Sequence, residues 1–191
     1  MQILNLIQGS PEWLQARAQH FCASDAPAMM GESIYKTRSA LLAEKKFGKV
    51  EEFDNATMLR FANGHAAEAS ARPSAEAILG EALYPVVCVS DDGKLLASVD
   101  GMTMGEDVLF EHKLYNESLA QSVRNKDLGP TYYWQLEHQL LVTGAKTVLF
   151  MCSSGADDSK REWMHYVSIP SRRAALIAGW DQFAADLAAY A

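Results

Sequence analysis

Residues 95–114 constrain this chain more than any other stretch, because their sequence, LLASVDGMTMGEDVLFEHKL, predicts two β-strands joined by a short glycine-containing turn. Asp100 ends the first strand, and Glu111 and Lys113 lie in the second. Side chains two positions apart in a strand point to one face, so Glu111 and Lys113 share a side and His112 points away from it. We therefore expect Asp100 and Glu111 to lie close together, with the backbone carbonyl of His112 beside them.

This grouping of charges suits a hard divalent cation. Magnesium and manganese prefer oxygen ligands in an octahedral arrangement, which two carboxylates and a carbonyl begin to supply. A neighbouring lysine can hold a water molecule or the charge of a phosphate, as metal-assisted phosphodiester hydrolysis requires. The same residues also fit a simpler interpretation, solvated charges at a hairpin, which this stretch alone does not exclude.

The length and composition favour one globular unit. The chain has 191 residues, of which 49% are hydrophobic, enough for one sizeable core and short for two. We therefore expect residues 1–191 to form a single domain. The net charge of −7 argues against a protein that coats nucleic acid without specificity, but it permits a local basic patch or a basic ring interior that grips DNA.

The cysteines and the hydrophobic runs argue against further classes. Three widely separated cysteines, Cys22, Cys88 and Cys152, form no C-x-x-C pair, which disfavours a zinc ribbon and a four-cysteine iron–sulfur cluster. Scattered thiols of this kind fit a reducing cytoplasm. No apolar run reaches the roughly 18 residues of a membrane span, and the N-terminus lacks a signal-peptide pattern. We expect a cytoplasmic protein with no membrane partner.

Hydrophobic periodicity and turn residues predict alternating helices and strands. The apolar N-terminal segment is expected at a sheet edge, Pro73 is expected to break or kink the longest helix, and residues 116–127 form either a helix or a loop. This order predicts an α/β fold with a central mixed sheet flanked by helices. The expected helices cover residues 11–20, 24–31, 37–47, 56–79, 132–143 and 172–190, and the expected strands cover residues 82–90, 94–100, 107–114, 146–152 and 162–169.

The first two helices carry candidates for binding an anion. Trp13 and Arg17 are four residues apart and so share one helix face. Core packing explains Trp13 equally well, whereas Arg17 on a mostly apolar helix invites an anionic partner. Ser24 is expected to cap the next helix, and because helix N-termini bind phosphate, Ser24 and Arg17 could hold one anion together.

Polar residues on two later helices have simpler interpretations. Glu68 and Arg72 are four residues apart and fit a solvated ion pair on a helix surface. Gln135 and Gln139 have the same spacing on a largely apolar helix, where a polar stripe usually faces solvent.

Five motifs follow one another along the chain. They are S-P-E-W-L-Q-A-R with A-S-D, then G-H-A-A-E, S-V-D-G, E-H-K, and Y-Y-W-Q-L-E-H-Q-L-L-V-T-G. Together, from about Ser10 to Ile169, they resemble the lambda-exonuclease family (YqaJ-type, phage alkaline exonucleases). That family is a branch of the PD-(D/E)XK nucleases, which implies a restriction-endonuclease-like core. Two positions depart from its pattern: Val99 replaces the usual proline before the first acid, and Glu137 stands where a second glutamine is common, so that its charge could tune the site or face solvent.

The resemblance implies a role for each matching residue of the hydrolytic site. Lys113 would position or activate the attacking water, Gln135 would orient Lys113 or that water, and Glu68 would act through a second ion or its waters. The implied metal ligands are Asp100, Glu111 and the backbone carbonyl of His112, holding one or two Mg²⁺ ions, with Mn²⁺ as an alternative.

The resemblance also implies how a DNA end is held. Arg17, Ser24 and Ser98 match a pocket for the 5′-phosphate, and because Ser98 and Asp100 are two apart on one strand, pocket and metal would share a face. Trp13 is a candidate DNA contact. Phe61 matches an apolar residue that parts the terminal base pairs, although core packing explains a phenylalanine there at least as well.

These implied roles predict a Mg²⁺-dependent exonuclease that digests one strand of linear duplex DNA from its 5′ end and leaves a 3′ single strand. Family members form a ring-shaped homotrimer and partner a single-strand annealing protein in phage or prophage recombination. Three alternatives stay open: a DNA-end-binding subunit without activity, a restriction- or repair-type endonuclease, and a small-molecule hydrolase that uses the same metal site.

Overall fold

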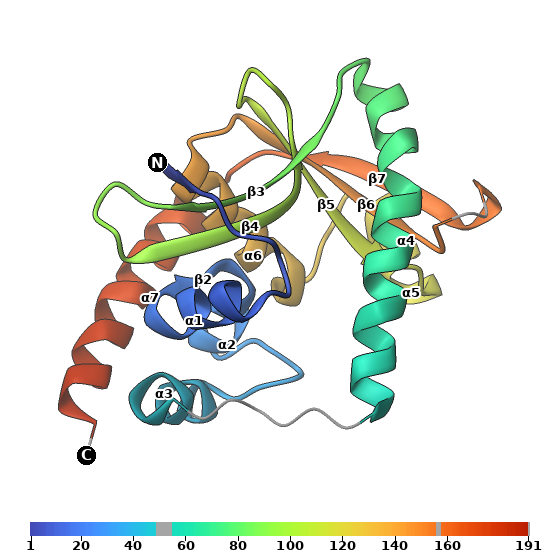
Figure 1. The fold of residues 1–191 in the computed structure, drawn as a ribbon. Coiled ribbons are helices and arrows are strands. Elements are labelled where there is room, and N and C mark those ends of the chain that lie inside the picture. The colour runs from blue at the N-terminus through green and yellow to red at the C-terminus, as the bar shows by residue number, and fades with distance from the viewer. Residues whose placement is uncertain (49–54, 156–157, 191) are drawn as a thin grey trace.

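A seven-stranded mixed β-sheet with helices on both sides forms the centre of the protein (Figure 1). The computed structural model describes residues 1–48, 55–155 and 158–190, apart from the side chains at 55–63, 65 and 158. The strands are β1 (Gln2–Leu4), β2 (Phe21–Cys22), β3 (Tyr84–Val89), β4 (Leu95–Met102), β5 (Val108–Leu114), β6 (Thr147–Ser153) and β7 (Arg161–Tyr166).

The strand order confirms the predicted mixed sheet. The strands lie in the order β1-β3-β4-β5-β6-β7, and β2 adds to β4. β5 pairs with β6 and β2 with β4 in parallel, and the other neighbours are antiparallel. The apolar N-terminal segment lies at the sheet edge as expected, whereas β2 was not predicted, because two residues are too short to show a period.

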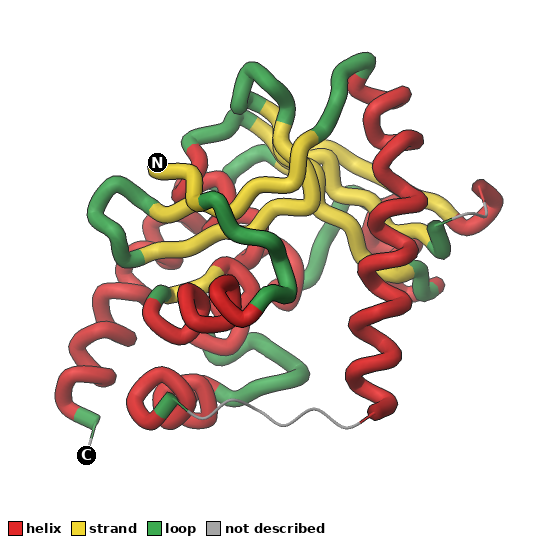
Figure 2. Tube along the Cα trace, in the orientation of Figure 1, coloured by secondary structure: helices red, strands yellow, loops and turns green. Residues whose placement is uncertain are grey.

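The helices begin and end close to the predicted positions (Figure 2). Side chains of Ser10, Thr37 and Asn116 cap three of them, and Gly144 ends another in the left-handed conformation. None of the helices in the described part of the chain has the length and apolar character needed to traverse a bilayer. The helices are α1 (Pro11–Gln19), α2 (Ala26–Met29), α3 (Arg38–Phe47), α4 (Asn55–Leu79), α5 (Glu117–Arg124), α6 (Pro130–Thr143) and α7 (Pro170–Ala189).

Two predictions about helix ends are wrong. Ser24 caps no α-helix: it lies inside the 3₁₀ turn η1 (Ala23–Asp25), and the one-turn helix α2 that follows has no side-chain cap. Pro73 does not break α4, which continues through it as a single 25-residue helix. Pro73 is exposed, so the backbone hydrogen bond that it cannot donate is lost at the surface rather than in the core.

Apolar side chains pack on both faces of the sheet. On one face, α5 and α6 cover β3 to β7 through buried side chains such as Leu119, Leu136 and Leu140. α7 packs against the outside of α6, together with α2 and α3. On the other face, α4 covers Phe110 and Leu149, and α1 covers the β3–β4 end of the sheet.

Glu137 anchors the C-terminal helix, which corrects both expectations for this residue. Its side chain is fully buried, so it does not face solvent, and it points away from the carboxylates of β4 and β5. Its carboxylate accepts hydrogen bonds from the Tyr166 hydroxyl (2.7 Å), the Ser168 hydroxyl (2.6 Å) and the backbone N–H of Ile169 (2.7 Å). Because Ile169 directly precedes α7, Glu137 fixes the point at which that helix leaves the sheet.

We expect His138 to make the fold sensitive to acid. It is fully buried and its Nδ1 accepts a hydrogen bond from Trp180 Nε1 (3.0 Å), and burial lowers its pKa from 6.5 to about 3. In mild acid His138 therefore binds a proton in the unfolded chain and stays neutral in the folded chain. The contribution of neutral His138 to the free energy of unfolding is present above pH 6.5 and is lost as the pH falls. Between pH 7 and pH 5 the loss is about 2 kcal/mol.

Urea unfolding of the wild type and of His138→Gln at both pH values measures this effect. The glutamine can still accept from Trp180 but does not titrate, so the variant should lose less stability on acidification. His165→Gln, at an exposed position on β7, is the control and should behave as the wild type. Equal losses in all three proteins would contradict the assignment.

Candidate active site

The site forms where β4 and β5 separate. Backbone pairing between the two strands ends at Gly101 and Phe110. On its other side, β4 pairs Met102 with Tyr84 but Val99 with Val86, so β4 carries one extra residue, a β-bulge, around Asp100. Bulges next to a strand separation redirect side chains. Here the Asp100 carboxylate turns into the gap and accepts a hydrogen bond from the backbone N–H of His112 (2.7 Å).

Gly101 is required by this close approach. A Cβ at position 101 would lie 2.9 Å from the Cβ of Leu83 and 3.3 Å from that of Phe110. Any larger residue would push the strands apart at the last pair that holds them together. The glycine after Asp100 therefore belongs to the architecture of the gap.

The backbone of His112 also faces the gap. Its N–H points toward β4 and donates to Asp100, and because the C=O of a strand residue points to the same side as its N–H, the carbonyl is directed to the gap as well. The imidazole points the other way and bonds to the Ser153 hydroxyl (2.9 Å). Burial, reinforced by the Lys113 charge, lowers the imidazole pKa from 6.5 to about 4, so the ring is neutral near pH 7.

Glu111 is the centre of a hydrogen-bond network. One carboxylate oxygen accepts from Lys113 Nζ (2.5 Å) and from Gln135 Nε2 (2.7 Å), and the other accepts from Gln139 Nε2 (2.7 Å). Only 3% of the Glu111 side chain is exposed, whereas Lys113 is about one-third exposed. Three donors thus hold the carboxylate in place, and part of the Lys113 side chain reaches solvent.

The two glutamines correct the expectation of a solvent-facing stripe. Both lie on the side of α6 that faces the sheet, and Gln139 is fully buried. Gln139 was not recognised as a site residue from sequence. Its spacing of one helical turn from Gln135 was the available signal.

The charges at the gap are unbalanced in favour of carboxylates. Burial, followed by the negative charges of Glu111 and Glu68, raises the pKa of Asp100 well above its usual value. Burial lowers the pKa of Lys113, but the carboxylates of Glu111 and Asp100 outweigh it and the net pKa is raised. Lys113 therefore carries its proton and acts as a cation.

Glu68 approaches the gap from α4, on which it pairs with Arg72 (2.7 Å). It is not a fully solvated surface residue, since only 17% of its side chain is exposed and its charge acts on Asp100. Among the residues that the structure describes, no three His, Cys, Asp or Glu side chains alone form a metal-binding cluster. The available oxygen donors are therefore the carboxylates at the gap together with the His112 carbonyl.

A second group of residues lies beside the gap and has the composition of an anion site. Arg17 donates to the Ser24 hydroxyl (3.1 Å), and its guanidinium stacks over the Trp13 ring, 4.7 Å from the centroid. Trp13 Nε1 donates to the Ser98 hydroxyl (2.8 Å). Each serine oxygen thus accepts from a fixed N–H, and its own proton can be donated to a bound anion.

Gln139 joins this group to the carboxylates. Its side-chain amide donates both to Glu111 and, at 3.3 Å, to the backbone carbonyl of Ser98. Through Gln139 the Ser98 backbone and the Glu111 carboxylate lie close together, and β4 carries its bulge around Asp100, two residues beyond Ser98. The side chain of Phe61 lies outside the described part of the chain.

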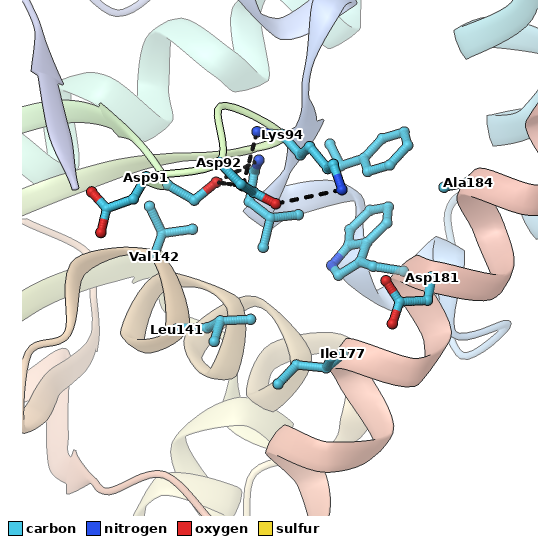
Figure 3. Close-up of a pocket in the computed structure, with 12 residues that line it drawn as sticks. Asp91, Asp92, Lys94, Leu141, Val142, Ile177, Asp181 and Ala184 are labelled. Carbon is cyan, nitrogen blue, oxygen red and sulfur yellow. Dashed lines mark hydrogen bonds and ion pairs between the residues drawn. The ribbon is translucent and has the colours of Figure 1, made fainter.

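A separate cavity of about 380 Å³ lies between the β3–β4 turn, α6 and α7 (Figure 3). Trp180 is among the residues that line it, and its charged residues are Asp91, Asp92, Asp181 and Lys94, with Lys94 paired to Asp92 at 3.6 Å. It contains none of the predicted site residues. An excess of carboxylates repels phosphate, so this cavity does not have the composition of an anion site.

Comparison with known proteins identifies the family of the chain. The family model of the YqaJ-like viral recombinase domain matches residues 12–146, most of the chain. The chain belongs to this family. No curated protein matches the sequence.

Solved structures share the fold of this YqaJ-like chain. An alkaline exonuclease from Laribacter hongkongensis, LHK-Exo, superposes with a TM-score of 0.77 at 22% identity, over 94% of this chain and 93% of that one. Its complex with dAMP gives the same TM-score at 23% identity and the same coverage. A phage-related exonuclease from Haemophilus somnus 129PT has a TM-score of 0.56 at 13% identity, over 88% of this chain and 96% of that one. The predicted α/β nuclease fold is confirmed.

Proposed function

We propose that this YqaJ-like protein is a divalent-metal-dependent exonuclease that hydrolyses linear duplex DNA from a 5′-phosphorylated end and leaves a 3′ single strand. The observation that carries the proposal is the convergence of Asp100, Glu111 and Lys113 at the separation of β4 and β5. The fold of the alkaline exonucleases supports it.

The donor set fits a magnesium or manganese ion. Asp100, Glu111 and the His112 carbonyl supply hard oxygens. Burial, followed by the negative charges of Glu111 and Glu68, raises the pKa of Asp100, and a bound cation would offset those charges. Glu68 would hold a second ion or its waters. A bound ion would polarise the scissile phosphate and lower the pKa of the attacking water.

The side chains of the chain itself have distinct tasks in this proposal. Lys113, as an ammonium ion, holds the attacking water and neutralises charge on the phosphate. Gln135 and Gln139 fix the Glu111 carboxylate, which in turn fixes Lys113. Arg17, Ser24 and Ser98 bind the terminal phosphate with Trp13 as a support, and Gln139 sets their distance from the carboxylates.

A single gel assay tests the proposed activity. End-labelled linear duplex and covalently closed circular duplex are incubated with Mg²⁺, with Mn²⁺ or with EDTA. We expect labelled mononucleotides from the 5′ end of the linear DNA, intact circles, and no reaction in EDTA. Nicked circles would indicate an endonuclease instead, and retention of uncut DNA ends would indicate a binding subunit.

Arg17→Ala should reduce the preference for a phosphorylated end. The guanidinium supplies charge-assisted hydrogen bonds to the terminal phosphate, so its loss should lower kcat/KM on 5′-phosphate ends by about 10-fold or more and leave 5′-hydroxyl ends nearly unchanged. Initial rates on matched duplexes measure this. Arg38→Ala, which removes an arginine paired with Asp186 on α7, is the control. Equal losses on both kinds of end would remove Arg17 from the pocket.

The proposal extends to the assembly. The whole chain, residues 1–191, would act as one nuclease domain within a ring-shaped homotrimer that encloses the duplex. It would partner a single-strand annealing protein during phage or prophage recombination in the host cytoplasm. A ring reconciles the net charge of −7 with DNA binding, because basic groups can line its interior. Sedimentation equilibrium at several concentrations would reveal a monomer if the trimer is wrong.

A further inference from the structure

A buried ion pair lies behind the anion site. Lys45 of α3 and Asp25 of η1 are joined at 3.0 Å, and only 5% and 8% of their side chains are exposed. Lysine and aspartate are seldom buried unless each has a partner. A buried ion pair is weak evidence for stability, because desolvation opposes the attraction, so its place in the structure calls for another explanation.

Lys45 fixes the end of the helix that carries Arg17. Its ammonium group donates to the backbone carbonyls of Arg17 and His20, both at 2.8 Å, in addition to contacting Asp25. These carbonyls belong to the last turn of α1 and the residue after it, where backbone oxygens lack partners within the helix. The third hydrogen-bond acceptor of Lys45 is Cys22 Sγ at 3.9 Å, and Asp25 Oδ2 lies within ion-pair distance of the same nitrogen.

Asp25 fixes the side chain of the same arginine. One of its carboxylate oxygens faces Lys45, and the other lies 4.0 Å from Arg17 Nη2, the atom that donates to Ser24. The guanidinium is therefore bounded by Asp25, Ser24 and the Trp13 ring, while 27% of the Arg17 side chain stays exposed. The pair thus holds both the backbone and the charged end of Arg17.

The charges explain why Asp25 requires Lys45. A lone carboxylate 4.0 Å from the guanidinium would repel a phosphate that binds there. The buried lysine neutralises this carboxylate, so the pocket retains the net positive charge of Arg17.

We propose that the Asp25–Lys45 pair positions Arg17 for the terminal phosphate and so determines end specificity. The inference rests on the proposed function, since it names further positioning residues of the same site. It makes a directional claim: removing the lysine alone leaves an uncompensated carboxylate beside the phosphate, whereas removing both charges does not.

The test compares the ratio of kcat/KM on 5′-phosphate ends to that on 5′-hydroxyl ends. Lys45→Met should lower this ratio by about 10-fold or more, mainly by raising KM on phosphorylated DNA. The double variant Asp25→Asn with Lys45→Met should recover part of the ratio, and Lys45→Arg should keep most of it. Lys36→Met is the matched control. Lys36 pairs with Glu44 on α3, the helix that carries Lys45, and does not contact Arg17.

The outcomes separate the inference from the proposed function. A wild type without metal-dependent cleavage, or without a preference for phosphorylated ends, contradicts the proposed function itself. A wild type that prefers phosphorylated ends, together with a Lys45→Met variant that keeps the wild-type ratio, overturns only the role of the pair. If Lys45→Met does not fold, the ratio of kcat/KM on 5′-phosphate and 5′-hydroxyl ends is measured for the isosteric variant Asp25→Asn instead. An unchanged ratio in that variant also overturns the role of the pair.

Discussion

Replacement of Lys113 by alanine should lower the rate of DNA hydrolysis by about 10²–10³-fold while binding of DNA ends persists. In the proposed function the ammonium group is the cation that faces the reacting phosphate, and the neighbouring carboxylates keep it protonated, so alanine would remove charge stabilisation and the hold on the water together. Arg17 and the two serines are untouched, so the terminal phosphate still binds.

Single-turnover cleavage and fluorescence anisotropy with end-labelled duplex measure the two effects separately. Lys94→Ala is the matched control, since Lys94 is an exposed lysine paired with Asp92 in the cavity between the β3–β4 turn, α6 and α7. Normal turnover in Lys113→Ala would remove Lys113 from the mechanism. Loss of end binding together with cleavage would mean that the lysine holds the fold rather than the reacting groups.

Replacement of Asp100 by asparagine should abolish metal-dependent cleavage and stabilise the metal-free protein. Burial and two neighbouring carboxylates raise the pKa of Asp100, so its ionisation opposes folding. This penalty is absent below the usual pKa of 3.8 and grows as the pH rises through the raised value. Asparagine keeps the acceptor for the His112 N–H and carries no charge. We expect a melting temperature about 2–4 °C higher for each kcal/mol relieved.

Thermal melts at pH 8, with and without Mg²⁺, test both parts of this expectation. The wild type should be stabilised by the metal and Asp100→Asn should not, because binding to the folded state alone raises the melting temperature. Asp181→Asn, in the cavity between the β3–β4 turn, α6 and α7, is the control and should respond to metal as the wild type does. If metal-free Asp100→Asn melts at a lower temperature than the wild type, the ionised Asp100 carboxylate does not destabilise the metal-free fold.

The sequence was informative wherever a period of two or of 3.6 decides the structure. Strand alternation predicted that Glu111 and Lys113 meet and that His112 turns away, and the structure has both features. The turn between the strands brought Asp100 into range, but the bulge that turns its carboxylate was not predictable. A bulge depends on the register of the neighbouring strand, and register is a property of the whole sheet.

The contacts of α6 show the same limit. Glutamines on an apolar helix were expected to face solvent, and Glu137 was expected either to tune the site or to face solvent, because a single helix pattern does not reveal two covered sides. Gln135 and Gln139 meet the sheet, and Glu137 meets the start of α7. Ser24 was expected to cap an α-helix and does not, yet its hydroxyl accepts a hydrogen bond from Arg17.

Helix α6 joins the C-terminal helix to the candidate site, because Gln139 binds the Glu111 carboxylate and Glu137 binds the backbone N–H of Ile169, directly before α7. Because a helix moves as a nearly rigid body, a tilt of α6 at its contact with α7 also shifts its contact with Glu111. Repacking of α7, far from any reacting atom, should therefore alter turnover before it alters folding. Variants selected for faster or slower digestion should include substitutions on that outermost helix.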